Sequence, residues 1–550
     1  MIEAVSRRAL LPLSVALAGA GLASAAEPLR AGEHGYALAA GVYRVDANMR
    51  IDADLKLAPG AVIEIAPGAT LQLSGHFEAP LSRVFAGSGR VDLNHGRTPH
   101  AHPEWWGAAP GDSGRDSLAA MQACHAAHPV MQLLPADYYL SDTLVVERAF
   151  SRITGSGFRG TDGWQGTRLI LTNGRGDVMR VGPRSRPPSV NDFPQNIEIR
   201  SLALCRSAPV DAGAGRQPVG LAASYLLYAR FEQVSAAEHG TSFLLHGLVR
   251  SQLIDCVAFR SIPAVQGGQP WRGFLLDGMS DIGLAGGNAS LFMTDCNATI
   301  GGNPGVSDSV GLLLEGAFAD SFITNFEATA VAVGIRVDGQ TARIGDRARN
   351  GHVNLHIRMP IVDQCGEAGI VIRDTSAHMM IDLAEPYVAV APQGRAGIRC
   401  EAMHGSLAIQ GGQLVGTTNS AAGGTAVGLL VNDSEGLQVR GLKILEHAAP
   451  VELSACRGFA LQGWIGNPRH ATPRDAALLR DCARGTVALL VVGRDRAFGG
   501  GVAIEGTARR LRIDTNGHDD AALSGGEDNR VRRRGRPVPV QGDSLFLDEA

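Results

Sequence analysis

The feature that most constrains the fold is a five-residue frame that returns along the middle and C-terminal parts of the chain. The frame reads glycine, apolar, variable, apolar, polar, and its seven copies begin at Gly273, Gly311, Gly334, Gly369, Gly397, Gly428 and Gly501. The residues one and three after the glycine are apolar in 14 cases of 14, and the residue four after it is charged or an amide in all seven. This period of two predicts a strand with one buried face.

The spacing of the copies restricts how these strands can be arranged. The first six copies start 38, 23, 35, 28 and 31 residues apart, without helical periodicity between them. A βαβ protein needs helices between its strands, and an up-and-down barrel shows hairpin signals about every 8–12 residues. The spacing therefore predicts a parallel β-helix, in which each coil covers the apolar edge of the last. With strands about 4.7–4.9 Å apart, ten to twelve coils would form a rod of roughly 50–60 Å.

The composition agrees with one long domain and excludes several other classes of protein. The chain has 550 residues, of which 45% are apolar, 5% are aromatic and 70 are glycine. The glycines follow no three-residue period, which excludes collagen. The 50 basic and 54 acidic residues give a net charge of −4, so no nucleic-acid partner is predicted. No apolar stretch of 18 or more residues follows residue 30, so we also predict no membrane span.

The first 25 residues are predicted to be a cleaved export signal. Arg7 and Arg8 precede the weakly apolar run 9–22, and Ala-Ser-Ala at 23–25 offers a small-residue cleavage site. The two arginines fit either a twin-arginine signal or an ordinary Sec signal. The mature protein is therefore expected in the periplasm or outside the cell.

Eight cysteines are spread along the chain, and no two lie within 20 residues of each other. This spacing excludes a CxxC redox motif and a zinc ribbon. Several follow an aspartate in similar local sequences, as in Asp255-Cys256, Asp295-Cys296 and Asp481-Cys482. We interpret them as small apolar side chains at equivalent interior positions, with a disulfide framework as the alternative. Neither a metal nor a cofactor is predicted.

Four segments follow from these patterns. After the signal, residues 26–100 are predicted to form a β-rich head, because short alternating runs are separated by two Ala-Pro-Gly turns at 58–60 and 66–68. Residues 101–495 should form the β-helix, with the gap from 428 to 501 filled by coils whose frame is degraded. Residues 496–550 are interpreted as a polar tail, in which the basic run 530–536 is either solvated or an anion-binding patch.

Residues 101–144 are predicted to cap the start of the β-helix. They contain one helix, over roughly 117–127 with Asp116 or Ser117 as its cap, followed by strands at 130–134 and 138–140. Trp105-Trp106-Gly107, the Gly/Asp loop after it and the double tyrosine at 138–139 make this run resemble the start of the pectate-lyase-like superfamily. Arg115-Asp116-Ser117 departs from the usual Asp-Asp-Thr, and Asp137 stands where glycine is usual.

The resemblance implies an all-β, right-handed, single-stranded parallel β-helix with a small N-terminal β/helix cap. The superfamily includes polysaccharide lyases, β-helical glycoside hydrolases and phage tailspike depolymerases, so a polysaccharide substrate is implied. The trimeric tailspikes make a homotrimer one option for the assembly. Trp105, Trp106 and Asp116 are expected to build the cap rather than to catalyse. The Asp-Pro-His motif of the epimerases, the ordered motifs of the polygalacturonases and the Arg-x-Pro-x-x-Arg of the pectate lyases are absent.

The polar position of the frame supplies the candidate catalytic residues. It is occupied in turn by Asp277, Glu315, Asp338, Arg373, Glu401, Asn432 and Glu505. Glu315 and Asp338 lie 23 residues apart, which is about one coil, so we expect them to be neighbours. Two carboxyls about 5 Å apart match a retaining glycosidase, and a pair two coils apart suits an inverting one. Their mutual repulsion would raise one pKa and create the proton donor.

Other residues are comparable candidates. Glu327 and Asp363 lie in neighbouring outward segments and are further catalytic candidates. Arg336, Arg373 and Arg399 would bind substrate, and in a lyase they would neutralise a uronate carboxylate before Tyr387 or a histidine removed the α-proton. Trp271, in the polar loop 266–273, is expected to stack on a sugar ring. His352 and His356 share a strand face, but without a third ligand they are expected to pack on a coil.

Together these features predict an exported enzyme that cleaves the glycosidic bonds of a polysaccharide along an outer groove. Hydrolysis is slightly favoured over β-elimination, because carboxylates recur in the frame and no lyase motif does. The alternative is a non-catalytic carbohydrate-binding or surface-structural β-helix, which would need the same repeated frame.

Overall fold

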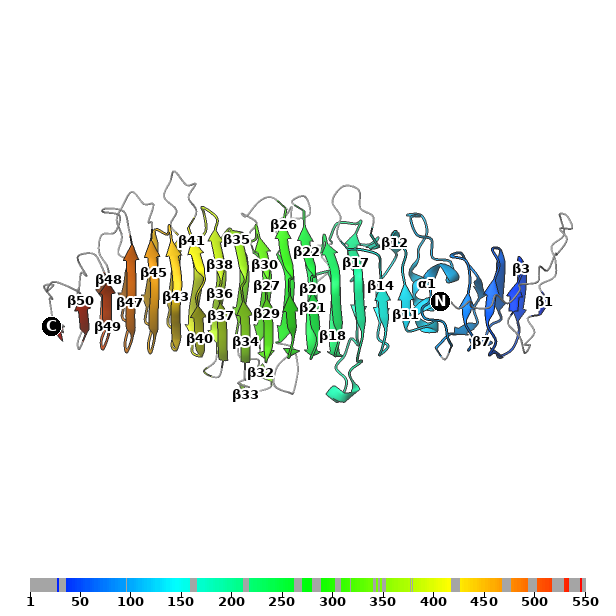
Figure 1. Cartoon of the computed structure of the whole chain (residues 1–550), viewed down its shortest axis with the longest axis horizontal. Coiled ribbons are helices and arrows are strands. Elements are labelled where there is room, and N and C mark those ends of the chain that lie inside the picture. Colours follow the sequence, from blue (N-terminus) through cyan, green and yellow to red (C-terminus); the bar gives the residue numbers. More distant parts are fainter. Residues whose placement is uncertain are drawn as a thin grey trace, which may run out of the picture. The chain divides into compact units, whose positions relative to one another are not determined.

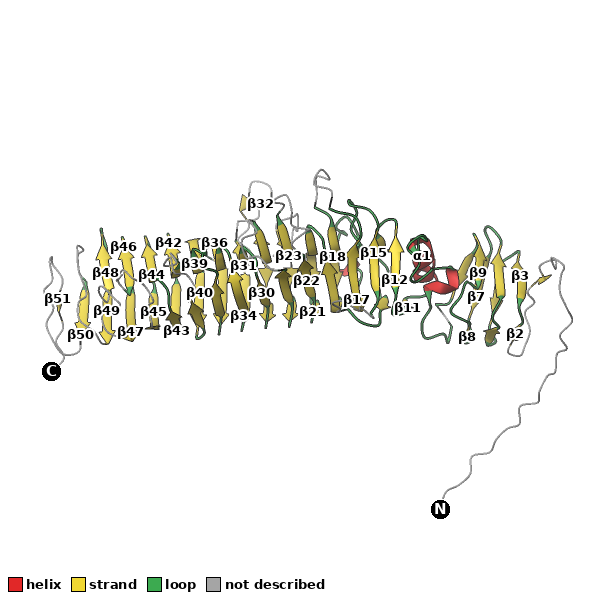
Figure 2. Cartoon of the chain, turned by 90° about the horizontal axis from the view of Figure 1, so that it is seen from above, coloured by secondary structure: helices red, strands yellow, loops and turns green. Residues whose placement is uncertain are grey.

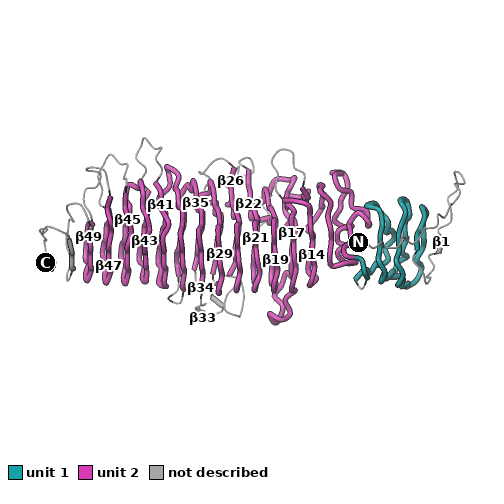
Figure 3. The backbone as a smooth tube through the Cα atoms, viewed as in Figure 1, with its two compact units in different colours: residues 1–98 teal, residues 99–550 magenta. Residues whose placement is uncertain are grey.

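The computed structural model divides the chain into two compact units, Met1–Thr98 and Pro99–Ala550 (Figure 3). Strands account for 57% of the structure and helices for 4%. The described residues are 27–28, 36–94, 96–158, 166–210, 217–261, 270–278, 288–301, 308–316, 318–339, 343–344, 347–348, 353–375, 377, 379–416, 426–466, 476–492, 502–516, 529–533 and 545–546. The predicted export signal lies outside them.

The first unit is a short parallel β-helix with three faces. The faces are β2 (Tyr36–Leu38), β5 (Leu55–Leu57) and β8 (Phe77–Glu78); β1 (Glu27–Pro28), β3 (Gly41–Val45), β6 (Ala61–Ile65) and β9 (Phe85–Gly87); and β4 (Met49–Ile51), β7 (Thr70–Leu73) and β10 (Arg90–Asp92). Every pairing among them is parallel. Gly60 and Gly68 end the two Ala-Pro-Gly turns with φ of +86° and +80°, which glycine adopts without strain. The alternating runs therefore predicted strands here, but not that they stack in parallel.

The second unit contains a much longer coil of parallel strands (Figure 1). Its 15-stranded sheet consists of β13 (Leu144–Val146), β16 (Met179–Val181), β18 (Val219–Leu227), β20 (Thr241–Val249), β23 (Trp271–Gly278), β27 (Ser309–Gly316), β31 (Val333–Asp338), β36 (Ala368–Thr375), β39 (Ala396–Met403), β42 (Val427–Asn432), β44 (Ala449–Ser454), β46 (Ala477–Arg480) and β48 (Val502–Glu505), with β24 (Asn288–Ala289) and β28 (Phe318–Ala319) off this path. The path has 13 described strands, one per coil, where ten to twelve coils were expected.

The remaining faces of the coil form a 24-stranded sheet. Its strands are β11 (Val130–Gln132), β12 (Asp137–Leu140), β14 (Arg152–Thr154), β15 (Arg168–Leu171), β17 (Glu198–Arg206), β19 (Arg230–Ala237), β21 (Gln252–Ile254), β22 (Val257–Arg260), β25 (Phe292–Thr294), β26 (Asn297–Ile300), β29 (Ser321–Thr324), β30 (Glu327–Thr329), β34 (Val353–Arg358), β35 (Ile361–Cys365), β37 (Met379–Ala384), β38 (Tyr387–Val390), β40 (Ser406–Gln410), β41 (Gln413–Val415), β43 (Leu437–Leu445), β45 (Ala460–Gly466), β47 (Thr486–Val492), β49 (Arg512–Asn516), β50 (Arg530–Arg533) and β51 (Leu545–Phe546). Only the small pair β32 (Arg343–Ile344) and β33 (Arg347–Ala348) is antiparallel among the described strands. The predicted right-handed parallel β-helix is confirmed.

Apolar side chains stack from coil to coil inside this unit. The residue after each frame glycine lies opposite its equivalent in the next coil, so that Phe274 pairs with Leu312 and Leu312 with Ile335. All 14 apolar frame positions are fully buried. Stacking removes this apolar surface from water and stabilises the coil along its whole length.

The frame glycines are required by the close approach of adjacent coils. A Cβ on Gly311 would lie 2.7 Å from the carbonyl oxygen of Gly334, and a Cβ on Gly334 would lie 2.8 Å from the carbonyl oxygen of Gly369. The same clash recurs at Gly397, where the distance to the carbonyl oxygen of Gly428 would be 2.7 Å. Because these oxygens belong to the backbone, they cannot rotate away.

The cap contains the main helical elements of the second unit, η1 (Pro103–Trp106) and α1 (Leu118–Ala127), which lie side by side (Figure 2). The predicted helix is thus confirmed. Asp116 accepts hydrogen bonds from the backbone amide of Leu118 at 3.0 Å and from the amide of Ser141 at 3.1 Å. It therefore ties the start of α1 to the first coil, in keeping with its expected structural role, and Trp105 is buried. A further 3-10 turn, η2 (Val190–Asp192), lies in the loop before β17.

Two predictions about the ends and the interior have clear outcomes. The prediction that residues 496–550 form a polar tail is wrong for the first part of this segment, because β48, β49 and β50 continue the sheets. The last frame copy carries this continuation, since its two apolar positions, Val502 and Ile504, are fully buried. The cysteines are interior residues with free thiols, all buried except the half-buried Cys205. None of the described helices is long and apolar enough to cross a membrane.

We expect Gly397→Ala to destabilise the second unit. Its new Cβ would meet the carbonyl oxygen of Gly428, and overpacking of this kind costs about 1–3 kcal/mol. The midpoint of urea unfolding, followed by circular dichroism, should fall accordingly. Gly301→Ala is the matched control, because the nearest atom to its new Cβ is 3.7 Å away. Equal midpoints for the two variants would contradict the close-approach explanation.

We also expect the fold to lose stability between about pH 6.5 and pH 4. Burial lowers the pKa of His447 from 6.5 to about 4. As the pH falls through this window, the unfolded chain takes up a proton that the folded chain does not, so the free energy of unfolding decreases, by up to about 3 kcal/mol for this residue. His447→Leu should remove part of this dependence in urea titrations at pH 7 and pH 4.5. An unchanged pH dependence would exclude His447 as a source of it.

Candidate functional site

The strands of the 15-stranded sheet bring polar side chains into one row on the outer surface. In each coil a polar residue follows the second buried apolar position of the strand. The parallel register sets this polar residue opposite its equivalent in the next coil. We call this set the polar row, and it consists of His246, Asp277, Glu315, Asp338, Arg373 and Glu401. The row follows from the frame, because the apolar residue before each member points into the coil and the member itself points outward.

Three carboxylates occupy consecutive places in the polar row. Asp277 lies opposite Glu315 on the neighbouring strand, and Glu315 lies opposite Asp338. Adjacent strands are about 4.8 Å apart, so three like charges would be crowded here if all were ionised. Burial raises the pKa of Glu315, and the charges of Asp277 and Asp338 raise it further. Glu315 is therefore the carboxyl group of the three best suited to carry a proton.

Asp338 is engaged on both oxygens by arginines. Arg336 contacts one oxygen at 2.7 Å, and Arg373 donates to both, with its Nη2 at 3.0 Å from the oxygen that Arg336 also contacts. Asp338 is only 5% exposed. Burial raises its pKa, whereas Arg336 opposes this effect. This arrangement orders the two guanidinium groups around Asp338, one coil from Glu315, and leaves Asp338 little access to a ligand.

A tyrosine and a histidine extend the row at its N-terminal end. The Nε2 atom of His246 lies 3.1 Å from the Tyr225 hydroxyl, and its Nδ1 atom lies 3.0 Å from the carbonyl oxygen of Asp277. Because a carbonyl only accepts, Nδ1 carries the proton, and in the neutral ring Nε2 accepts from Tyr225. The Asp277 carboxylate is also 3.5 Å from Nδ1. Tyr225 is in the left-handed region with φ of +53°, a conformation that it shares with many other non-glycine residues of this coil, so the conformation alone does not mark a functional site.

The strict frame predicts neither Tyr225 nor His246, although the sequence holds a signal for His246. Residues 220–224 read Gly-Leu-Ala-Ala-Ser and residues 242–246 read Ser-Phe-Leu-Leu-His. The first fits the frame with a serine at its polar end, and the second fits when serine is allowed in place of the starting glycine. A frame relaxed in this way would have placed His246 in the row, one coil before Asp277.

The structure separates the other predicted site residues from the carboxylates. Arg399 is paired with Glu367 at 3.1 Å and with Glu401 at 3.4 Å, and it lies two coils beyond Arg336 in the middle position of the frame. Arg373, by contrast, is within the row. Of the predicted substrate-binding arginines, Arg336 and Arg373 are therefore the two brought next to the carboxylates.

Glu327 and Asp363 lie on another face of the coil. They belong to β30 and β35 of the 24-stranded sheet, where Asp363 is opposite Thr329, two positions along the strand from Glu327. Tyr387 begins β38 in the same sheet. These side chains are thus on adjacent strands, but they are not brought to Glu315.

The expected role of Trp271 is wrong. Its side chain is completely buried within β23, so it cannot stack on a sugar at the surface. The residues before it are polar, but alternation along the strand turns the indole toward the interior. His356 stacks on Phe322 with ring centres 4.7 Å apart and contacts Asp382 at 3.4 Å, while His352 lies outside the described residues. Within the described part of the chain, no three His, Cys, Asp or Glu side chains are gathered as a metal site would require.

The sequence matches no protein-family model and no curated protein. The fold is similar to that of the A-module of a mannuronan C-5 epimerase of Azotobacter vinelandii, at 14% identity over 82% of this chain and 100% of that chain, with a TM-score of 0.37. The Dettilon tailspike protein is similar at 10% identity over 74% of this chain and 68% of that chain, with a TM-score of 0.46. A surface adhesin of Streptococcus pneumoniae is similar at 9% identity over 74% of this chain and 100% of that chain, with a TM-score of 0.37. Such distant likenesses carry no argument about activity, so the chemistry rests on the residues of this chain.

Proposed function

We propose that this protein is an exported enzyme that hydrolyses the glycosidic bonds of a polysaccharide at the polar row. The observation that carries the proposal is the stacking of Asp277, Glu315 and Asp338 on three consecutive coils. Glycoside hydrolysis needs one protonated and one ionised carboxyl group close together, and the crowding around Glu315 supplies that difference in pKa.

In this proposal Glu315 is the proton donor and Asp277 is the nucleophile. The two residues are on adjacent strands, and about 5 Å between carboxyls suits the retaining mechanism. Glu315 protonates the oxygen of the leaving sugar while Asp277 attacks the anomeric carbon and forms a glycosyl ester. Glu315 then takes a proton from water, which hydrolyses the ester. The side chain of Asp277 is 23% exposed, whereas that of Asp338 is 7% exposed, which favours Asp277 over Asp338 for this role.

Asp338 is then a positioning residue. Its charge raises the pKa of Glu315, and its oxygens order Arg336 and Arg373 at the edge of the site. Glu315 and Asp338 thus both keep a role in the proposed site, but the nucleophile is Asp277, the other neighbour of Glu315.

A second candidate reaction is β-elimination, which the Tyr225–His246 hydrogen bond favours. A tyrosine that has passed its proton to His246 could remove the α-proton of a uronate. The electron pair would form the new double bond and expel the glycosidic oxygen, which Glu315 would protonate. An adjacent arginine would neutralise the uronate carboxylate and make the α-proton more acidic. A non-catalytic binding module is the third alternative, because polar side chains at strand ends occur on any β-helix.

We expect Glu315→Gln to reduce turnover by about 10²–10⁴-fold, the usual contribution of general acid catalysis. Release of reducing ends from a panel of acidic and neutral polysaccharides measures it, and in the wild type the rate should fall as the pH rises through the raised pKa of Glu315. Glu327→Gln is the matched control, since it removes the same charge from another face. If the wild-type protein bound a polysaccharide but released no product, the result would support a binding module and overturn the proposal of an enzyme.

Azide rescue distinguishes the roles of the two aspartates. Asp277→Ala should lose turnover and regain it with sodium azide, because azide attacks the anomeric carbon in place of the carboxylate and leaves as a glycosyl azide. Asp338→Ala should also lose activity, but without rescue, because it acts by holding two arginines. Rescue of Asp338→Ala alone would assign the nucleophile to Asp338 instead.

Tyr225→Phe separates hydrolysis from elimination. A hydrolase should keep its activity in this variant, because the hydroxyl takes no part in the two carboxyl steps. A lyase should lose it, and its wild type should produce the ultraviolet absorbance of an unsaturated uronate. Appearance of that absorbance, together with its loss in Tyr225→Phe, would replace hydrolysis with elimination as the reaction.

A further inference from the structure

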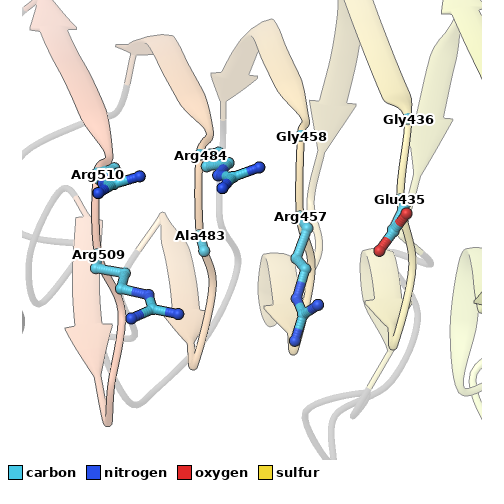
Figure 4. Close-up of a pocket in the computed structure, with 8 residues that line it drawn as sticks. All are labelled: Glu435, Gly436, Arg457, Gly458, Ala483, Arg484, Arg509 and Arg510. Carbon is cyan, nitrogen blue, oxygen red and sulfur yellow. The ribbon is translucent and has the colours of Figure 1, made fainter.

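A groove rich in arginine runs across four consecutive coils near the C-terminal end of the second unit. It has a volume of about 510 Å³ and lies at the corner where the chain passes from the 15-stranded to the 24-stranded sheet. Eight residues line it, and we call them the arginine groove: Glu435, Gly436, Arg457, Gly458, Ala483, Arg484, Arg509 and Arg510 (Figure 4).

The groove is built by two columns of stacked residues. One column is formed by parallel bridges that join Glu435 to Arg457, Arg457 to Ala483, and Ala483 to Arg509. The residue after each of these forms the second column, and all four are in the left-handed region, with φ of +73°, +60°, +56° and +57° in chain order. Backbone hydrogen bonds hold adjacent coils together here, for example from Arg484 to Arg509 at 3.2 Å.

Side-chain size explains why the corner is hollow and positively charged. Glycine at 436 and 458 and alanine at 483 leave space beside the backbone, while the arginines of the neighbouring coils border that space (Figure 4). Arg484 and Arg510 occupy left-handed positions where the two preceding coils use glycine, although this conformation costs a non-glycine residue about 1–2 kcal/mol.

The four arginines have no ion-pair partner within the described part of the chain. Elsewhere on the coil, exposed arginines are commonly paired, as Arg480 is with Glu505 at 2.8 Å. Against four guanidinium groups, the groove contains only the carboxylate of Glu435. An anionic ligand would therefore relieve the mutual repulsion of these groups, and the planar guanidinium matches both carboxylate and sulfate oxygens.

The geometry favours a linear polyanion over a small anion. The arginines recur along the axis of the coil at steps of about 4.8 Å, so one sulfate or phosphate ion cannot reach them all. No aromatic side chain lines the groove, which disfavours a single-stranded nucleic acid, since its bases need a surface on which to stack. The net charge of −4 also disfavours a nucleic-acid partner.

We infer that the arginine groove is an anchoring subsite for an acidic polysaccharide, one that carries carboxylate or sulfate groups at regular intervals. The inference rests on the proposed function and names its substrate class. The groove begins three residues after Asn432, which is in register with Glu401 of the polar row. A polymer lying along that edge of the sheet would thus meet the carboxylates and, some coils further on, the arginines. Binding energy from such remote sugars can orient the bond to be cleaved.

The test measures binding in the absence of turnover. The full chain with Glu315→Gln is titrated, by isothermal titration calorimetry, with a polyuronate, a sulfated glycan, neutral dextran and single-stranded DNA. The two acidic glycans should bind, with an affinity that falls steeply as salt increases, and dextran should bind at least tenfold more weakly. The stronger of the two acidic glycans then identifies carboxylate or sulfate as the recognised group.

Variants assign the binding to the groove. Replacing Arg484 and Arg510 by glutamine should weaken the acidic glycan about tenfold or more and flatten the salt dependence. The matched control, Arg440→Gln with Lys443→Gln, removes two exposed positive charges from β43 and should leave binding unchanged. Thermal unfolding of both double variants checks that the fold is retained.

Four results would overturn the inference. Three of them are equal affinity of the acidic glycan for both double variants, binding of dextran as tight as that of the acidic glycans, and binding of DNA tighter than that of either glycan. The fourth is inorganic sulfate that competes for the groove and binds as tightly as the polymer does. Failure of the proposed function gives a different result. If binding depended on salt and required Arg484 and Arg510, but the wild-type chain released no product, the arginine groove would stand as a binding site and the proposed enzymatic function would be rejected.

Discussion

The close approach of one coil to the next is the constraint on which the rest of this structure depends. At the six frame glycines that the structure describes, an added Cβ would lie only 2.5–2.8 Å from a carbonyl oxygen of the following coil, so a side chain at this point would push the coils apart. Stacking at this distance pairs each strand with its neighbour in parallel and aligns the apolar positions into buried ladders. A single clash would disturb the pairing on both sides, because each coil contacts only its neighbours.

The register of the strands aligns the residues of the candidate site. Since side chains alternate between the two faces of a strand, fixing the glycine also fixes which residue faces outward four positions later. Residues as distant in sequence as His246 and Glu401 therefore share one row. The pKa of Glu315 is raised through the same alignment, which sets Asp277 and Asp338 on either side of it. The order of the polar row is thus a consequence of the order in which the coils stack.

Much of this arrangement could be predicted from the sequence, because the frame reports backbone register directly. The coil, the buried ladders and the neighbourhood of Glu315 and Asp338 all follow from the glycine spacing. His246 is not predicted because Ser242 replaces the glycine that marks other coils, and Tyr225 is not predicted because it lies one residue beyond the frame that starts at Gly220. The polar neighbours of Trp271 predict an exposed side chain, but the strand turns this side chain into the interior. The ion pairs of Asp338 were beyond prediction, since they depend on side-chain conformations that no local pattern encodes.

The distribution of charge along the coil connects the two proposed sites physically. An acidic polymer brought to three carboxylates would be repelled, unless cations lay beside them. Arg336 and Arg373 provide those cations, but Asp338 already neutralises part of their charge. In the proposed function the attraction for the polymer comes from elsewhere, and the arginine groove, whose four guanidinium groups have no ion-pair partner among the described residues, can supply it. Separating attraction from chemistry in this way adds no further cation beside Glu315, where Arg272 and Arg336 already lower the pKa that burial and the two aspartates raise.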